Sequence, residues 1–237
     1  MVRASIVVSL LAAIALVAGC SGGATAQGLS LGDAPWQDGD QALYQIVSRE
    51  GAPVGRSEFA FAREGGAWVL SATDKIGQLD QAYTVRLDPA TLKPLGEVKT
   101  IHTADTDVTL STTYGQGRLK IEALVNGEER SATIDVPDGA LDNDQLLMTL
   151  RALRFAEGYQ GSYVNVVAAN AAKIKTTVRV VGQEAVEVPA GSFQAWRVEL
   201  DFGQAKQHAW YQVDPPHHMV QYDNGNLKYV LDAASPP

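Results

Sequence analysis

The sequence predicts an all-β domain, mainly antiparallel, with about a dozen strands curled into a half-barrel or barrel and one short helix. From Gln41 onward, apolar residues alternate with polar residues, as expected for strands that bury one face and expose the other. Turn sequences such as Asn126-Gly127 and Asn224-Gly225 link the strands too tightly for parallel crossovers, so consecutive strands should pair as antiparallel hairpins. A sheet of this size with one apolar face cannot stay flat, and we therefore expect it to curl.

Period-two alternation marks each predicted strand in chain order. It is clear where Lys120 and Glu122 separate Leu119, Ile121 and Ala123. The predicted strands contain residues 42–46, 59, 68–72, 108–114, 119–123, 132–136, 163–168, 174–181, 193–200, 208–213, 219–222 and 227–231. Strands and helices do not alternate along the chain, which argues against a parallel α/β fold.

One segment has the spacing of a helix instead. Three leucines of this segment share one helical face: Leu146, Leu150 and Leu153. Asp142 and Gln145 have the spacing of a capping box, and Gly158 follows as a stop signal. We expect a helix of about three turns over residues 143–155 that covers the concave face of the sheet.

The first residues have the pattern of an export signal. Arg3 precedes an apolar run at residues 4–18, which is short for a membrane span but typical of a signal peptide. Val17-Ala18-Gly19-Cys20 resembles a bacterial lipobox, and this resemblance implies cleavage before Cys20, a diacylglyceryl group on its thiol and acylation of its amine, for example with palmitate. The alternative is an ordinary secretory signal with an incidental cysteine.

The resemblance to a lipobox places the protein in the cell envelope, on the extracytoplasmic side. Ser21 follows the cysteine where an inner-membrane lipoprotein would carry an aspartate, which implies the outer membrane if the source is Gram-negative. Residues 21–40 hold five glycines and neither lysine nor arginine, as in a flexible tether. We expect a signal peptide at 1–19, the lipidated cysteine and tether at 20–40, and one β-rich domain at 41–237. Trp36 should pack on the edge of the domain.

The amino-acid composition argues against several classes of function. Hydrophobic residues make up 46% and charged residues 19% of the chain, which is typical of a globular protein with a core. The net charge of −8 argues against a nucleic-acid partner, because phosphates would repel it. The chain has one cysteine, so a disulfide within the chain and a cysteine-rich metal site are excluded.

A set of small motifs resembles a known group of proteins. It comprises Leu150-Arg151-Ala152-Leu153, residues 187–193 with Pro189-Ala190-Gly191, Ala209-Trp210-Tyr211, and residues 214–220 with His217-His218. Residues 142–231 thus resemble a widespread family of exported bacterial β proteins of unknown function, and more distantly the lipoprotein carriers of the LolA and LolB type. The carrier resemblance implies a concave sheet that holds an acyl chain, but only by analogy of fold.

No catalytic residue or cofactor site is expected. The chain lacks the G-x-S-x-G motif of serine hydrolases and a phosphate-binding glycine loop, and the anchor uses its cysteine. A metal site could combine His208 with His217 or His218, but the paired histidines follow Pro215-Pro216 in a turn, where their side chains diverge. Acidic pairs such as Asp142 and Asp144 are interpreted as solvated loop and cap positions. We therefore expect a protein that is not an enzyme.

Candidate ligand-binding residues are the tryptophans on predicted strands, Trp68, Trp196 and Trp210, together with Arg151 on the helix. Aromatic side chains could line an apolar site, and an arginine at its mouth could meet an anionic head group. Two functions remain open, and the sequence favours the first, because a large sheet with one apolar face has more apolar surface than one short helix can cover. A carrier would hold a lipid or another hydrophobic ligand in the half-barrel, whereas a structural or interaction lipoprotein would fill the half-barrel with its own side chains. The expected partner is the membrane, through the anchor at Cys20, and the sequence indicates no particular protein partner.

Overall fold

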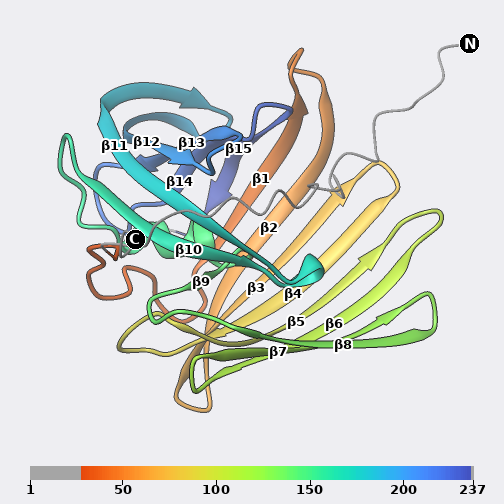
Figure 1. The fold of residues 1–237 in the computed structure, drawn as a ribbon. Helices are drawn as coiled ribbons and strands as arrows, with labels where there is room; N and C mark the ends of the chain where they lie inside the picture. The colour runs from red at the N-terminus through yellow and green to blue at the C-terminus, as the bar shows by residue number, and fades with distance from the viewer. Residues whose placement is uncertain (1–27, 236–237) are drawn as a thin grey trace, which may run out of the picture.

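The computed structural model describes residues 28–235 and shows one strongly curved sheet of fifteen strands (Figure 1). The predicted signal peptide and Cys20 lie outside the described residues. The first eight strands are β1 Gln41–Ser48, β2 Pro53–Glu64, β3 Ala67–Ile76, β4 Leu79–Leu87, β5 Pro94–His102, β6 Asp107–Gly115, β7 Arg118–Val125 and β8 Glu128–Asp135. The others are β9 Leu141–Asp142, β10 Gln160–Val167, β11 Ala172–Val188, β12 Gly191–Asp201, β13 Lys206–Gln212, β14 Met219–Asp223 and β15 Leu227–Ala234.

The sheet consists of two meanders that pair with each other through β1 and β15. Strands β1 to β8 follow one another in space, and β15 back to β9 continue the sheet on the other side of β1. Neighbouring strands pair antiparallel, as predicted, except for the short parallel pair of β9 and β10. The pairing of β1 with β15 brings Ser48 opposite Leu227, so strands from the two ends of the domain lie side by side at its centre.

The sheet is a half-barrel and not a closed barrel, because β8 and β9 are its terminal strands. Its two edges nevertheless approach each other. Leu119 and Ile121 of β7 belong to the same apolar cluster as Val166 of β10, and the Lys173 ammonium donates a hydrogen bond of 2.9 Å to the backbone oxygen of Asp135. Side-chain packing thus bridges a gap that backbone hydrogen bonds leave open.

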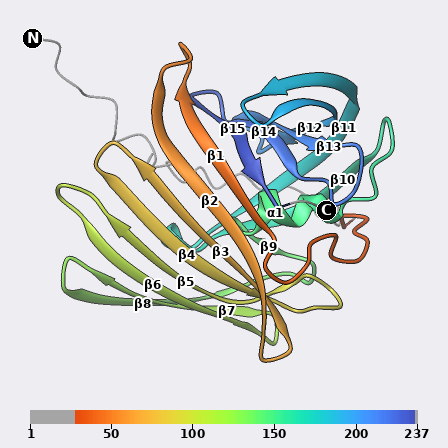
Figure 2. The ribbon, with the colours of Figure 1, turned by 180° about the vertical axis from the view of Figure 1, so that it is seen from behind.

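The helical segment is much shorter than the predicted helix over 143–155. It consists of α1 Leu146–Thr149 and the 3-10 turn η2 Leu150–Ala152, within the curl of the sheet (Figure 2). A second 3-10 turn, η3, covers Ala168–Asn170. The helix ends because Leu153 takes an extended conformation and forms a β-bridge with Leu31. Within the described residues, no helix is long and apolar enough to span a membrane.

The segment before β1 packs against the domain, although the sequence predicted a tether up to residue 40. The backbone amide of Arg154 donates to the oxygen of Ser30, and the amide of Gly32 donates to the oxygen of Ala152. Trp36 stacks on Phe61 with a ring separation of 4.1 Å, which confirms its contact with the domain. Burial of this large ring stabilises the contact and outweighs the flexibility of the glycine-rich sequence. Residues 28–40 therefore pack against the helical segment, through these hydrogen bonds and the bridge of Leu31 with Leu153.

Three strands, β4, β5 and β9, were not predicted from the sequence. The alternation of Tyr83, Val85 and Leu87 in β4 follows the usual pattern and could have been found. Strand β5 inverts the pattern, because Glu97 is buried and Val98 is 54% exposed. Strand β9 has only two residues, which is too short for any periodicity.

Large side chains fill the interior of the half-barrel. Tyr44, Phe61, Tyr163 and Tyr211 each expose less than 2% of their surface. Solvent-accessible area includes the walls of internal cavities, so a side chain without such area has no water-sized space beside it. The same core includes Met148 of α1, which places the helical segment in this packing.

Candidate functional site

Arg151 lies inside the protein and forms a buried ion pair. Its guanidinium donates a hydrogen bond of 2.8 Å to the carboxylate of Asp40, and Nε donates to the oxygen of Pro216 at 3.2 Å. The side chains of Arg151 and Asp40 are only 2% and 8% exposed. Arg151 also lies 5.9 Å from the ring of Trp36. Arg151 therefore does not lie at an open mouth, as predicted, but is buried against Asp40 and Trp36 of the segment before β1.

Trp68 belongs to the same region. Its ring is 6% exposed and lies 6.2 Å from Trp36 in an edge-on arrangement. The guanidinium of Arg63 lies over the same ring, 4.0 Å from its centre. The structure thus brings two predicted site residues, Trp68 and Arg151, together around Trp36.

Trp196 and Trp210 lie on β12 and β13 and make different contacts. Trp196 is half-buried and stacks on Phe155 at 6.0 Å. Trp210 is 8% exposed, and its Nε1 donates a hydrogen bond of 2.5 Å to Glu184. The predicted set of ligand-binding residues is therefore spread over two places in the fold.

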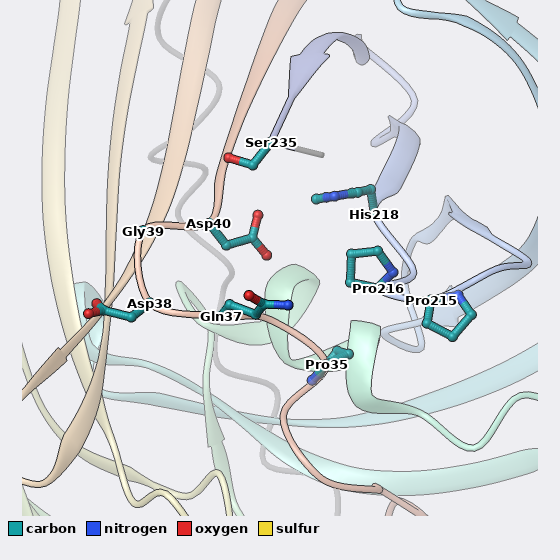
Figure 3. A pocket seen from close by; sticks show the side chains of 9 residues that line it. All are labelled: Pro35, Gln37, Asp38, Gly39, Asp40, Pro215, Pro216, His218 and Ser235. Atoms are coloured by element: carbon teal, nitrogen blue, oxygen red, sulfur yellow. The ribbon is translucent and has the colours of Figure 1, made fainter. Parts of the chain in front are cut away.

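A pocket of about 240 Å³ lies beside the Arg151–Asp40 pair (Figure 3). The loop before β1, the Pro215-Pro216 turn and Ser235 form its walls. The carboxylate of Asp40 and the imidazole of His218 point toward the same space in Figure 3. Asp40 Oδ1 and both ring nitrogens of His218 are buried and form no hydrogen bond within the described residues.

His218 is neutral at physiological pH. Burial, together with the nearby charge of Arg151, lowers the pKa of its imidazole to about 4, although Asp40 and a contact with the backbone of Ser235 act in the opposite direction. A neutral imidazole has one N–H donor and one acceptor nitrogen. Asp40 Oδ1 and both ring nitrogens of His218 are covered by other atoms of the protein, however, so they are not open to the pocket.

A second group of charged side chains, which we call the acidic centre, comprises Glu97, Lys99, Asp142 and Asp144. The ammonium of Lys99 lies 2.6 Å from Asp144, and the hydroxyl of Tyr114 donates a hydrogen bond of 2.6 Å to Asp142. Asp142 is 1% exposed and Glu97 is 3% exposed. The interpretation of Asp142 and Asp144 as solvated positions was wrong, because β9 and the turn after it place both side chains in the interior.

The crowding of carboxylates shifts their pKa values in different directions. Burial, followed by the charge of Asp144, raises the pKa of Asp142 to about 7. Burial and a hydrogen bond with Asp144 raise the pKa of Glu97 well above its usual range. Burial also acts to raise the pKa of Asp144, but the charge of Lys99 outweighs it, so the pKa falls. At neutral pH the centre thus holds protons as well as charges.

The acidic centre can bind protons, and its chemistry is that of a hard-cation site. Oxygens of Glu97, Asp142 and Asp144 all lie within 4.8 Å of one another, and carboxylates are the ligands that such cations prefer. Lys99 already provides a cation at this place, and we assign no metal. Little in the sequence indicates this centre, because Glu97 and Lys99 have the spacing of an ordinary solvated strand face.

Comparisons with known proteins agree with the fold. The model of a family described as "Protein of unknown function (DUF3108)" matches residues 43–232. No curated protein matches the chain. A crystal structure of a β-barrel-like protein of the domain of unknown function DUF1849 from Brucella abortus is similar, with 13% identity, 89% of this chain and 100% of that chain covered, and a TM-score of 0.56. At this identity the similarity concerns the fold alone.

Two further solved structures are weaker matches. A candidate lipoprotein from Parabacteroides distasonis has 10% identity, covers 88% of this chain and 99% of its own, and gives a TM-score of 0.33. A candidate exported protein with a YmcC-like fold from Bacteroides fragilis has 11% identity, covers 88% and 100%, and also gives 0.33. The resemblance to a β-rich family of unknown function is confirmed by the family match. The likeness to LolA and LolB carriers stays a prediction.

Proposed function

The chain belongs to the DUF3108 family, and on this premise we propose that it is a lipid-anchored protein of the cell envelope that works through its outer surface as a non-catalytic interaction module. The observation that carries this proposal is the filled interior. Tyr44, Tyr163 and Tyr211 occupy the space that a ligand of a carrier would need, and each exposes less than 2% of its surface. The half-barrel is therefore a packed scaffold.

The predicted lipid anchor at Cys20 supports a location at the membrane surface. Cys20 stands at the end of the lipobox-like segment, and Ser21 favours the outer membrane in a Gram-negative source. Because the packed part of the chain already includes Trp36 and Ser30, the chain between Cys20 and Gly28 can span no more than about 30 Å. The domain would thus work close to the surface of the bilayer.

The acidic centre supports a non-catalytic function. The pKa of Asp142, raised by burial to about 7, would suit a general acid or base. The side chain is only 1% exposed, however, and its oxygens bind Tyr114 and the backbone of Asp144. A substrate would have no route to this carboxyl group without a large movement of the packed strands.

A carrier of a lipid or another hydrophobic ligand is the alternative that the sequence favoured. It requires an apolar cavity on the concave side, lined by inward-facing side chains. Two of the pockets in residues 28–235 are lined by polar side chains such as Asp40 and Glu58, which do not suit a lipid. We therefore place the carrier second.

Lipid content and probe binding separate the two functions. The mature chain carrying Cys20→Ser would be purified without detergent, extracted for lipids and titrated with a fluorescent hydrophobic probe. We expect neither a co-purifying lipid nor probe binding. Tyr163→Ala serves as the positive control, because removal of this buried ring should open a cavity that takes up the probe. A lipid that co-purifies in equal amount with the Cys20→Ser protein would overturn the packed-scaffold proposal.

The anchor needs its own test. Mass spectrometry of the wild-type protein should show a diacylglyceryl group and an acylated amine on Cys20. The Cys20→Ser variant should appear in the soluble envelope fraction or persist as uncleaved precursor. An unmodified Cys20 in the wild-type protein would refute anchoring without bearing on the filled interior.

A further inference from the structure

The edge of strand β8 is a surface that the packed interior does not explain. β8 is a terminal strand of the sheet, and within residues 28–235 it pairs with no strand other than β7 (Figure 1). Residues 128–131 and Thr133 are exposed. The other terminal strand, β9, has two residues and offers no comparable edge. An unpaired strand edge presents a row of backbone donors and acceptors to which another strand can bind.

The turn before β8 determines which of its backbone groups face outward. Asn126 and Gly127 have positive φ angles of 52° and 84° and form a two-residue hairpin loop before Glu128. In such a hairpin the residues that flank the loop exchange hydrogen bonds, and every second residue after them does the same. The even-numbered residues of β8 therefore bond to β7. The backbone groups of residues 129, 131 and 133 point away from β7, toward the free edge.

Two contacts at the other end of β8 agree with this assignment. The amide of Val136, the next even-numbered position, donates to the backbone oxygen of Gly117 before β7 at 2.8 Å. The odd-numbered Asp135 instead accepts a hydrogen bond of 2.9 Å from the ammonium of Lys173 on β11. This last oxygen is thus already paired, and the free stretch of the edge runs from residue 129 to residue 133.

A groove on the outer face lies next to this free stretch. It has a volume of about 610 Å³ and is lined by residues of β6, β7 and β8. Leu124 in this groove is 44% exposed, and its cross-strand neighbour on β8 is Glu129. Glu128 pairs with Arg130 at 3.3 Å, whereas Glu129 has no ion pair within the described part of the chain. A lysine or arginine fits here, because its apolar stem can cover the leucine while its charge meets the carboxylate.

A second copy of the chain does not provide this cation. In an antiparallel pair of two β8 strands, residues whose backbones bond to each other also place their side chains on the same face. A copy can therefore set only Glu129, Ser131, Thr133 or Asp135 opposite Glu129, and none of these is a cation. Two chains with a net charge of −8 also repel each other. The charges favour a different protein with a basic segment.

We propose that the free edge of β8 binds an extended segment of another envelope protein as an added strand, with a lysine or arginine opposite Glu129. Backbone hydrogen bonds to residues 129, 131 and 133 provide the attachment, and the groove at Leu124 selects the basic side chain. This inference rests on the proposed function, because it names the surface through which the interaction module would work.

Hydrogen exchange tests whether the edge is free. It is measured by NMR on the mature Cys20→Ser chain, and analytical ultracentrifugation gives the oligomeric state. The amides of residues 129, 131 and 133 should exchange about tenfold faster, or more, than those of residues 130 and 132, which bond to β7. Equal protection of both sets in a monomer would mean that another part of this chain covers the edge. Equal protection in a dimer would mean that a second copy does, and either result overturns the proposal.

Synthetic peptides of about seven residues test the binding. The probe alternates threonine and lysine, so that its lysines lie on the outer face when it adds to β8. One control peptide has glutamate in place of lysine, and another carries N-methyl groups on the lysine amides, which removes the donors that face β8. The lysine peptide at millimolar concentration should slow exchange at residues 129, 131 and 133. Both controls should bind about fivefold more weakly, or less.

Each unexpected peptide result has a definite meaning. A lysine peptide that does not bind overturns the proposal. Equal binding of the glutamate peptide would refute the role of charge, and equal binding of the N-methylated peptide would refute the addition of a strand.

Glu129→Lys is the informative variant. This side chain is exposed and has no ion pair within residues 28–235, so the melting temperature should stay the same. The lysine peptide should bind about fivefold more weakly, and the glutamate peptide should bind more tightly by a similar factor. Glu58→Lys, at an exposed position on β2, makes the same change in net charge and should bind the lysine peptide like wild type. Equal binding of the lysine peptide by Glu129→Lys and Glu58→Lys would place the peptide elsewhere and refute the site.

Ser131→Pro tests the backbone of the edge. The substitution removes a donor that does not bond to β7, so the fold should tolerate it, as edge strands tolerate proline. Binding of the lysine peptide should weaken by about tenfold. Unchanged binding would show that the peptide does not pair with the backbone of β8.

This proposal and the packed scaffold fail in different experiments. A lipid that co-purifies with the Cys20→Ser protein would overturn the packed scaffold and leave the peptide results as they are. A lipid-free protein whose β8 edge binds no lysine peptide would overturn the added strand and leave the packed interior intact.

Discussion

Two groups of buried charges, the Asp40–Arg151 pair and the acidic centre, compensate the cost of burying charge in different ways. The pair balances one positive with one negative charge, and Arg151 also donates to the backbone oxygen of Pro216. The acidic centre sets three carboxyl groups against the single ammonium of Lys99. A buried charge without a partner is expensive, so the centre, in which carboxyl groups outnumber the ammonium group, must take up protons.

This difference indicates that a buried cluster with an excess of one charge tolerates the loss of one charged side chain. The stability of such a cluster also depends on pH. When one carboxylate is removed from the acidic centre, the others can give up a proton and pair with Lys99. When the carboxylate is removed from the balanced pair, Arg151 has no replacement. Substitutions at equivalent positions should therefore have unequal effects.

The largest effect is expected for Asp40→Asn. The substitution leaves the guanidinium of Arg151, which is 2% exposed, without a counter-charge, and such a loss costs about 3–5 kcal/mol in the free energy of unfolding. Urea denaturation at neutral pH measures it. Asp33→Asn, at an exposed position of the same segment, is the control and should change stability little. A cost for Asp40→Asn below that of the control would mean that the pair contributes nothing.

Asp144→Asn should cost less, about 1–3 kcal/mol, although Asp144 lies only 2.6 Å from Lys99. Glu97 and Asp142 remain close by and can ionise to replace the lost charge. The same urea experiment compares this variant with Asp40→Asn. If both variants lose equal stability, the excess of carboxyl groups gives no tolerance and the comparison fails.

Tyr114→Phe tests one hydrogen bond of the acidic centre. Its hydroxyl donates to Asp142 at 2.6 Å, and the loss of this bond should cost about 1 kcal/mol. Because Asp142 would lose a donor that favours its ionised form, the pKa of this carboxyl should rise further above about 7. Carbon-detected NMR of the Asp142 carboxyl follows this titration, and an unchanged or lower pKa would contradict the assigned role of Tyr114.

The smallest effect at neutral pH is expected for Glu97→Gln, but it should change the pH dependence. The pKa of Glu97 is higher in the folded than in the unfolded protein because of burial, so the folded state holds an extra proton and loses stability as the pH rises from about 5 to beyond 9. Replacement by glutamine should flatten the decrease between pH 7 and 9, where Asp142 contributes little. His218, with its lowered pKa, acts only below about pH 6.5 and in the opposite direction.

Unfolding by urea at several pH values from 7 to 9 measures this slope. Glu58→Gln, at an exposed position on β2, is the matched control and should keep the wild-type slope. An identical slope in the Glu97→Gln variant would show that Glu97 is ionised in the folded protein.

The sequence by itself determined the type of fold. Period-two alternation and tight turns predicted an antiparallel, curled sheet, because these signals depend on neighbouring residues along the chain. The twelve predicted strands all exist, and the missing β4 shows the same alternation at Tyr83 and Val85. The lipobox-like segment at Cys20 is equally local, although it lies outside the described residues.

Only the tertiary structure decided which polar residues are buried. Arg151 pairs with Asp40, which is 111 positions away, and Lys99 pairs with Asp144, 45 positions away. Strand β5 could not be identified from its pattern, because Glu97 faces inward to partners that follow β9 and Val98 faces outward. The helix stopped early because Leu153 pairs with Leu31 from the segment before the domain. Each of these outcomes depends on a partner distant in sequence, and a local pattern contains no information about such a partner.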